Sequence, residues 1–280
     1  MKWGQIKTIF ILCFLVLDIF LLTQYMEKNQ EPGEFKDQET SSFDDEMKRK
    51  NINLDNIPTE AGPSAFIQAN RYKFTEEDIK QLKNQEANTQ NDFLVSKFEE
   101  PIPIPSGLSE EDINAFLSKN ILYGDQYTFW NWNEEKNILL FFQTYNGNTI
   151  YYNKGGMLMI FLNEDGEMDS YAQTMLTDIE LGEEKEVSQP KATIKVLNNN
   201  DNLYTNDEIT DMKLGYHTLV PFESGLQVFV PTWKISINDN RTYFVNAIGA
   251  QIISRDETTF IEEIIDSVQV NESNSGSEES

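Results

Sequence analysis

The stretch IFILCFLVLDIFLL, residues 9–22, constrains the fold of this chain most strongly. Asp18 is its only charged residue. A helix from Trp3 to Tyr25 would be long enough to cross the membrane, which takes about 20 apolar residues. The two end residues are amphipathic aromatics, which favour the two membrane interfaces. We therefore expect a single transmembrane helix near the amino terminus.

A cleaved signal peptide has a similar charged start and apolar middle. The segment after the apolar run, TQYMEKNQEPGEF, contains no small-x-small cleavage site, and Cys13 lacks the small preceding residues that a lipoprotein needs. We therefore expect an uncleaved anchor in contact with membrane lipid. Lys2 and Lys7 mark the cytoplasmic end by the positive-inside rule. The chain is thus predicted to be a single-pass protein of the cell membrane, with a cytoplasmic N-terminus and its bulk extracytoplasmic.

The chain is strongly acidic, with 47 Asp and Glu against 22 Lys and Arg, and a net charge of −25. Such a surface repels phosphate backbones, so we expect no nucleic-acid binding. The one cysteine lies within the apolar run, which rules out an intrachain disulfide. An exported protein without disulfides is more typical of a bacterial surface than of a eukaryotic secretory route.

Composition divides the chain into five segments. We expect a cytoplasmic start and transmembrane anchor at 1–25, a flexible tether at 26–56, a first lobe at 57–185, a second lobe at 186–265 and a disordered acidic tail at 266–280. Both lobes contain a helix followed by strand-like runs. We therefore predict an α+β fold of antiparallel β-meanders with a few packed helices, and an arrangement as two similar lobes stays open.

Local signals support this fold. Thr75 to Asp78 is a capping-box pattern, which predicts a helix that continues to about Asn84. Asn146-Gly147 predicts a type I′ hairpin, since both residue types tolerate positive φ. The other expected elements are strands near 65–75, 91–100, 122–133, 138–145, 148–152, 156–162 and 167–176, a helix at 190–200, strands near 210–220, 226–237, 242–248 and 250–254, and a closing helix capped by Thr258 or Thr259.

Enzyme motifs are absent. A single histidine, His217, and one membrane cysteine exclude Cys–His catalysis outside the membrane and a multi-histidine zinc site. The run NNNDNLYTNDE is similar to a calcium loop, but Leu203 and Ile209 occupy the positions that need Gly and Glu. We predict no catalytic residues, no cofactor and no metal.

Trp130 and Trp132 are two residues apart on a predicted strand and so are expected to share a face. Exposed, they would form a stacking platform for a sugar or peptide. Buried, they are part of the core.

Asp18 is expected to face a partner helix. An aspartate inside a span is costly, about 2.5–3.5 kcal/mol at the centre, and gains from a polar partner. On a helix it shares a stripe with apolar residues, which suits helix packing. The predicted partner-helix contact comprises Ile11, Phe14, Leu15, Asp18, Leu22 and Tyr25. The alternative is that Asp18 merely draws interfacial water.

Two segments resemble a known family. MKWGQIKTIFILCFLVLDIFLL resembles the amino terminus of the YycI (WalI) family, and VPTWKISINDNRTYFVNAIGAQI resembles its carboxyl-terminal core. The length, single anchor and acidic exterior fit as well. The resemblance implies a mixed α+β outer domain with no catalytic residues. It also implies a membrane-anchored accessory regulator, which acts with a YycH-like protein on the sensor histidine kinase YycG (WalK). That kinase and its response regulator YycF control cell-wall metabolism.

Two other functions stay open at this point. One is an anchored, wall-associated module that binds glycan or peptide through Trp130 and Trp132. The other is an anchored hydrolase that uses paired carboxylates, although Glu76-Glu77 and Glu110-Glu111 are already explained by helix capping.

Overall fold

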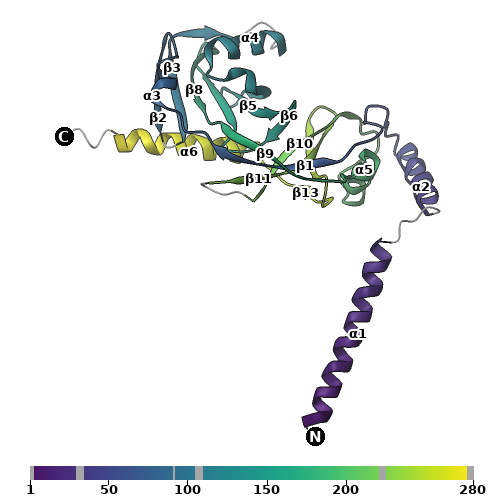
Figure 1. Cartoon of the computed structure of the whole chain (residues 1–280). Helices are drawn as coiled ribbons and strands as arrows, with labels where there is room; N and C mark the ends of the chain where they lie inside the picture. Colours follow the sequence, from purple (N-terminus) through teal and green to yellow (C-terminus); the bar gives the residue numbers. More distant parts are fainter. Residues whose placement is uncertain (1–2, 30–34, 91, 105–109, 221–224, 276–280) are drawn as a thin grey trace. The chain divides into compact units, whose positions relative to one another are not determined.

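The computed structural model describes residues 3–29, 35–90, 92–104, 110–220 and 225–275 (Figure 1). Contacts divide the chain into two units, residues 1–52 and 53–280. The described part of the first unit comprises the helices α1 (Trp3–Asn29) and α2 (Phe35–Arg49). Helix α1 covers the predicted apolar helix and continues past Tyr25. Helix α2 lies within the range in which we expected a tether.

The second unit has a mixed α+β fold dominated by antiparallel strands, as predicted. Thirteen strands occur among its described residues, and they form one sheet with the order β13-β12-β11-β10-β6-β5-β7-β8-β3-β2. Strand β4 pairs with β5, and β1 pairs with both β9 and β11. The strands are β1 (Ser64–Arg71), β2 (Gln85–Gln90), β3 (Phe93–Pro103), β4 (Tyr127–Asn133), β5 (Ile138–Tyr145), β6 (Asn148–Tyr151), β7 (Met157–Leu162), β8 (Glu167–Gln173), β9 (Leu176–Lys185), β10 (Ile209–Val220), β11 (Gln227–Ile237), β12 (Arg241–Asn246) and β13 (Ile252–Ile253). The helices are α3 (Glu76–Ile79), α4 (Glu110–Asn120), the 3-10 helix η2 (Gly124–Gln126), α5 (Pro190–Asn199) and α6 (Glu257–Ser275).

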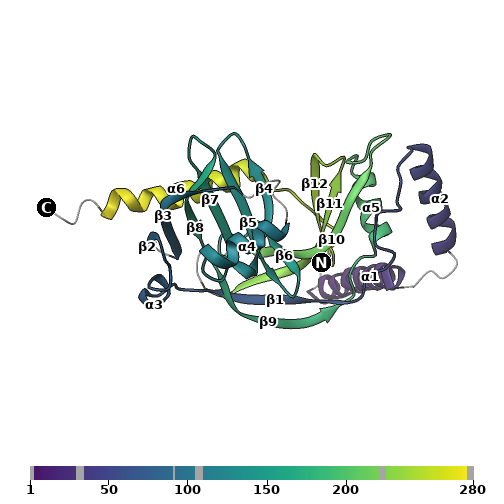
Figure 2. The ribbon, with the colours of Figure 1, turned by 90° about the horizontal axis from the view of Figure 1, so that it is seen from above.

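Strand β5 lies at the centre of the core and is buried on both faces. Leu139 and Phe141 pack in a cluster with α4, whereas Leu140 and Phe142 pack in a second cluster with α6. This alternation follows from the two-residue period of a strand. Helices α4 and α6 therefore cover opposite faces of this part of the sheet (Figure 2).

One parallel pairing joins the early strands to the late ones. Strand β6 pairs antiparallel with β5 and parallel with β10, through Tyr216 opposite Ile150 and His217 opposite Tyr151. Gly215 is needed here, because a Cβ on it would lie 2.6 Å from the Thr149 carbonyl oxygen. The ranges expected as two lobes, 57–185 and 186–265, thus share one sheet. Their status as a duplication stays a prediction.

The predicted hairpin turn and the first predicted capping box are both present in the structure. Asn146 and Gly147 have φ of 49° and 78°, which confirms the positive-φ hairpin. The Thr75–Asp78 capping box is present, but α3 ends at Ile79 rather than near Asn84, because the chain turns into β2, a strand that was not expected. The sequence holds a second capping-box pattern, Ser109 to Asp112, but Ser109 lies outside the described residues.

Helix α6 differs from the expectation at both ends. Asp256 caps it, since its carboxylate accepts the backbone N–H of Thr258 and the hydroxyl of Thr259, so neither threonine is the cap. The helix then runs through Ser275, past the predicted boundary at Ile265. Val268 is buried with Phe260 and Ile264, which explains why the helix continues.

Candidate functional site

The predicted partner stripe lies on α1. The side chains of Ile11, Phe14, Leu15, Asp18 and Leu22 are exposed, the apolar ones by 54–62%. Tyr25 lies on the same helix, but its side chain is outside the described part. Among the described residues, no helix combines the length and apolar character needed to cross a membrane.

Trp130 and Trp132 do not share a face, so that expectation is wrong. The register between β4 and β5 shifts between Phe129 and Asn131, which makes Trp130 the extra residue of a β-bulge. Trp130 packs in the α6 cluster and Trp132 in the α4 cluster, each half-buried. The indole N–H of Trp130 donates to Glu257 Oε2 at 2.9 Å. The two rings therefore do not form a joint platform, and a ligand role for either stays a prediction.

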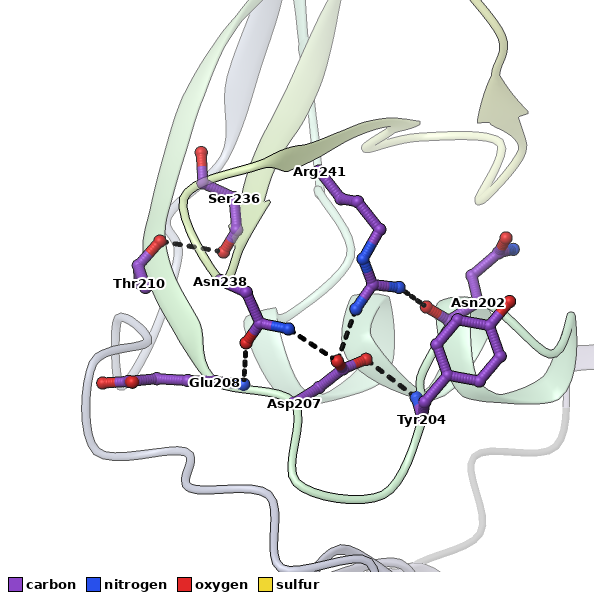
Figure 3. Close-up of polar contacts among 8 residues, drawn as sticks. All are labelled: Asn202, Tyr204, Asp207, Glu208, Thr210, Ser236, Asn238 and Arg241. Atoms are coloured by element: carbon purple, nitrogen blue, oxygen red, sulfur yellow. Dashed lines mark hydrogen bonds and ion pairs between the residues drawn. The ribbon is translucent and has the colours of Figure 1, made fainter.

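Asp207 holds the loop after α5 against the β11–β12 hairpin (Figure 3). Its carboxylate forms an ion pair with Arg241 and accepts the side-chain amide of Asn238 and the backbone N–H of Tyr204, both at 2.8 Å. Burial acts to raise the pKa of Asp207, but these hydrogen bonds outweigh it and lower the pKa below its usual value. The loop whose sequence is similar to a calcium loop is thus held by a cation of the chain itself, the guanidinium of Arg241. No group of three or more metal-ligating side chains occurs in the part of the chain that the structure describes.

His217 is a core residue of β10, 1% exposed. Its ring centroid lies 6.0 Å from that of Phe244. Nδ1 lies 3.2 Å from the Thr218 carbonyl oxygen, and Nε2 is buried with no partner among the described residues. This placement suits a neutral structural imidazole.

A cavity of about 470 Å³ lies between strand ends and α6. Arg71 ends β1, Gln227 begins β11, and Thr218 lies near the end of β10. The loop between β6 and β7 contributes Asn153 and Lys154. The cavity is also lined by Phe93, Tyr152, Arg255, Phe260 and Glu263.

Asn153 organises the floor of the cavity. Its amide nitrogen donates to Gln227 Oε1 at 2.6 Å and to Thr218 Oγ1 at 2.8 Å, and its Oδ1 accepts the backbone N–H of Gly155 at 2.7 Å. Arg71 Nη1 donates to Asp92 Oδ2 at 3.3 Å. Sequence reasoning missed these residues, because they come from segments far apart in the chain and form no local motif.

Comparisons with known proteins give one strong match. The family model described as YycI protein matches residues 33–248. No curated protein matches the chain. Among solved structures, an uncharacterized protein from Eubacterium rectale ATCC 33656 is 10% identical, with a TM-score of 0.42, over 73% of this chain and 89% of that one. The Bacillus megaterium YpeB C-terminal domain is 13% identical, with a TM-score of 0.34, over 68% of this chain and 90% of that one. The family match spans most of the 280 residues and confirms the resemblance stated above, so the chain belongs to the YycI family.

Proposed function

We propose that this chain is a membrane-anchored, non-enzymatic regulator of the YycG/YycF two-component system. It associates with a sensor histidine kinase of the YycG (WalK) type and with a YycH-like membrane protein, and so modulates signalling that controls cell-wall metabolism. The observation that carries the proposal is the family match over residues 33–248, since membership suggests a role in that system.

The exposed apolar surface of α1 supports the anchor. Large apolar side chains from Phe10 to Leu22 are 48–63% exposed, all around the helix. Contiguous apolar surface of this kind is normally covered by lipid or by another protein. Asp18 interrupts this apolar surface on one side of the helix only. A hydrogen bond between two helices contributes about 0.6–2 kcal/mol and can fix the register of a partner helix.

Regulation without catalysis requires a difference in affinity. A bound protein shifts a kinase between signalling states only if it binds one state more tightly than the other. Helix α1 and the folded unit at 53–280 offer two surfaces for such binding. Neither needs a reactive side chain.

The test is co-purification from membranes that contain the kinase and the YycH-like protein. Asp18→Leu should leave insertion intact and weaken co-purification or alter kinase output, because it removes the only carboxylate of the stripe. Asp18→Asn should be milder, since it keeps a hydrogen-bonding group of the same shape.

A matched control moves the carboxylate to the opposite face of α1. The double variant Asp18→Leu, Val16→Asp keeps one aspartate in the helix but places it about 160° away around the axis, at 100° per residue. It should behave like Asp18→Leu. If Asp18→Leu keeps both association and output, the role of Asp18 in helix contact is refuted. If the unsubstituted chain retains neither partner, the regulatory proposal itself fails.

A further inference from the structure

The cavity beside α6 contains two buried donors without acceptors. Gln227 is 1% exposed, and its Nε2 has no hydrogen-bond partner among the described residues. The same holds for Arg71 Nε, whose neighbouring Nη1 bonds Asp92. A buried donor left unsatisfied loses its hydrogen bond to water without replacement, so an acceptor from outside the chain would be favourable.

Both donors belong to residues that line the cavity, and both lie beside Gly155. A Cβ on Gly155 would lie 2.9 Å from Gln227 Nε2 and 3.1 Å from Arg71 Nε. A side chain at this position would therefore meet both nitrogens, and glycine lets them approach the backbone together. Asn153 Oδ1 lies 3.0 Å from the same point, but it already accepts the backbone N–H of Gly155. Two adjacent N–H donors match the two oxygens of one carboxylate.

The charge balance suits a single negative charge. Three basic side chains line the cavity, in a protein that is otherwise strongly acidic. Arg71 pairs with Asp92, and Lys154 pairs with Glu263 at 3.0 Å. Arg255 has no ion pair among the described residues, which leaves one positive charge in excess.

The rest of the wall is aromatic. Phe93, Tyr152 and Phe260 line the cavity and are 6%, 7% and 4% exposed. Sites for small molecules typically measure about 300–1,000 Å³ and combine apolar walls with a few convergent polar groups. The volume of about 470 Å³ falls in that range.

We propose that this cavity binds a small organic molecule with one carboxylate group and an apolar body. The carboxylate accepts from Arg71 Nε and Gln227 Nε2 at the floor, Arg255 supplies long-range attraction at the rim, and the body lies against the aromatic wall. The site would give this regulatory domain a chemical input, and it does not depend on the partner-binding role proposed above.

The test is titration of the purified full-length chain with N-acetylphenylalanine and with its uncharged amide, by calorimetry and ligand-observed NMR. The acid should bind saturably, and the amide at least about tenfold more weakly, the size expected for a charged hydrogen bond. Equal affinity for the acid and the amide, or no saturable binding of the acid, would overturn the proposal. Water would then be the acceptor for the two donors. Tighter binding of phenyl phosphate than of the acid would also overturn it.

Three variants localise the binding. Arg71→Lys keeps the charge beside Asp92 but removes the Nε donor, and should weaken acid binding about tenfold. Arg255→Gln, at an exposed position that tolerates change, should weaken it about two- to fivefold. Lys119→Gln removes an equal charge from α4, outside the cavity, and should change nothing. Unchanged affinity in Arg71→Lys and Arg255→Gln, with melting curves like that of the unsubstituted chain, refutes the assignment.

Discussion

Acidification should destabilise the folded chain through His217. Burial lowers the pKa of His217 from 6.5 to about 4, and the charge of Arg255 acts in the same direction, while the Thr218 carbonyl opposes it. The folded protein thus holds a neutral imidazole, whereas the unfolded chain takes up a proton near pH 6.5. The resulting stability is fully present above pH 6.5 and is lost as the pH falls toward the folded pKa.

The size of the effect follows from linkage. Each pH unit between the two pKa values costs about 1.4 kcal/mol, so lowering the pH from 7.5 to 5 should remove about 2 kcal/mol of unfolding free energy. For a unit of this size, that corresponds to a fall in Tm of about 4–8 °C.

The assay is urea unfolding of the full-length chain, followed by tryptophan fluorescence, at several pH values between 7.5 and 5. His217→Gln cannot take up the proton and supplies the control, because every carboxylate is common to both proteins. Between pH 7.5 and 5, the unfolding free energy of the His217→Gln variant should change by about 2 kcal/mol less than that of the unsubstituted chain. Parallel profiles for the two proteins would refute the reasoning. The non-enzymatic function also predicts that partner association survives this substitution.

Three further predictions concern other parts of the chain. Gly215→Ala should destabilise by about 1–3 kcal/mol in thermal melts, since its Cβ would meet the backbone of β6, whereas Gly62→Ala, with nothing near, should not. Asp207→Asn should lower the unfolding free energy by about 2 kcal/mol at pH 7 and by less in acid. The lowered pKa of Asp207 stabilises the fold only above the pKa that this group has in the folded state. A loss of unfolding free energy that is constant down to pH 3 would contradict this. Reporter fusions after residue 40 should be active only for an exported enzyme, and activity of a reporter confined to the cytoplasm would refute the topology.

The parts of the fold that could be predicted from sequence are those with local causes. The five strands from β4 to β8 follow from apolar runs separated by turns such as Asn146-Gly147, and α5 follows from its amphipathic pattern. The predicted meander is interrupted, because β7 pairs with β5 and not with β6. Strand β9 was not predicted as a long strand, because most of its residues are exposed and four of the ten are acidic. Its pairing with β1 makes it extended.

The candidate sites show the same division. The stripe on α1 was derived from helical spacing alone and stays a prediction. The relation between Trp130 and Trp132 was predicted wrongly, because a single bulge reverses the face of a side chain. The cavity was not predictable, since Arg71 and Gln227 meet only through the pairing of β1 with β11.

That pairing sets an order for folding during synthesis. Strand β1 leaves the ribosome early, yet both of its neighbours, β9 and β11, come much later in the chain. Until β11 is made, β1 presents unpaired edges, which are prone to aggregate. Pairings between distant segments also slow folding. The late strands therefore complete the fold rather than extend a finished one. We expect that a chain truncated before β11 does not fold as an independent amino-terminal domain.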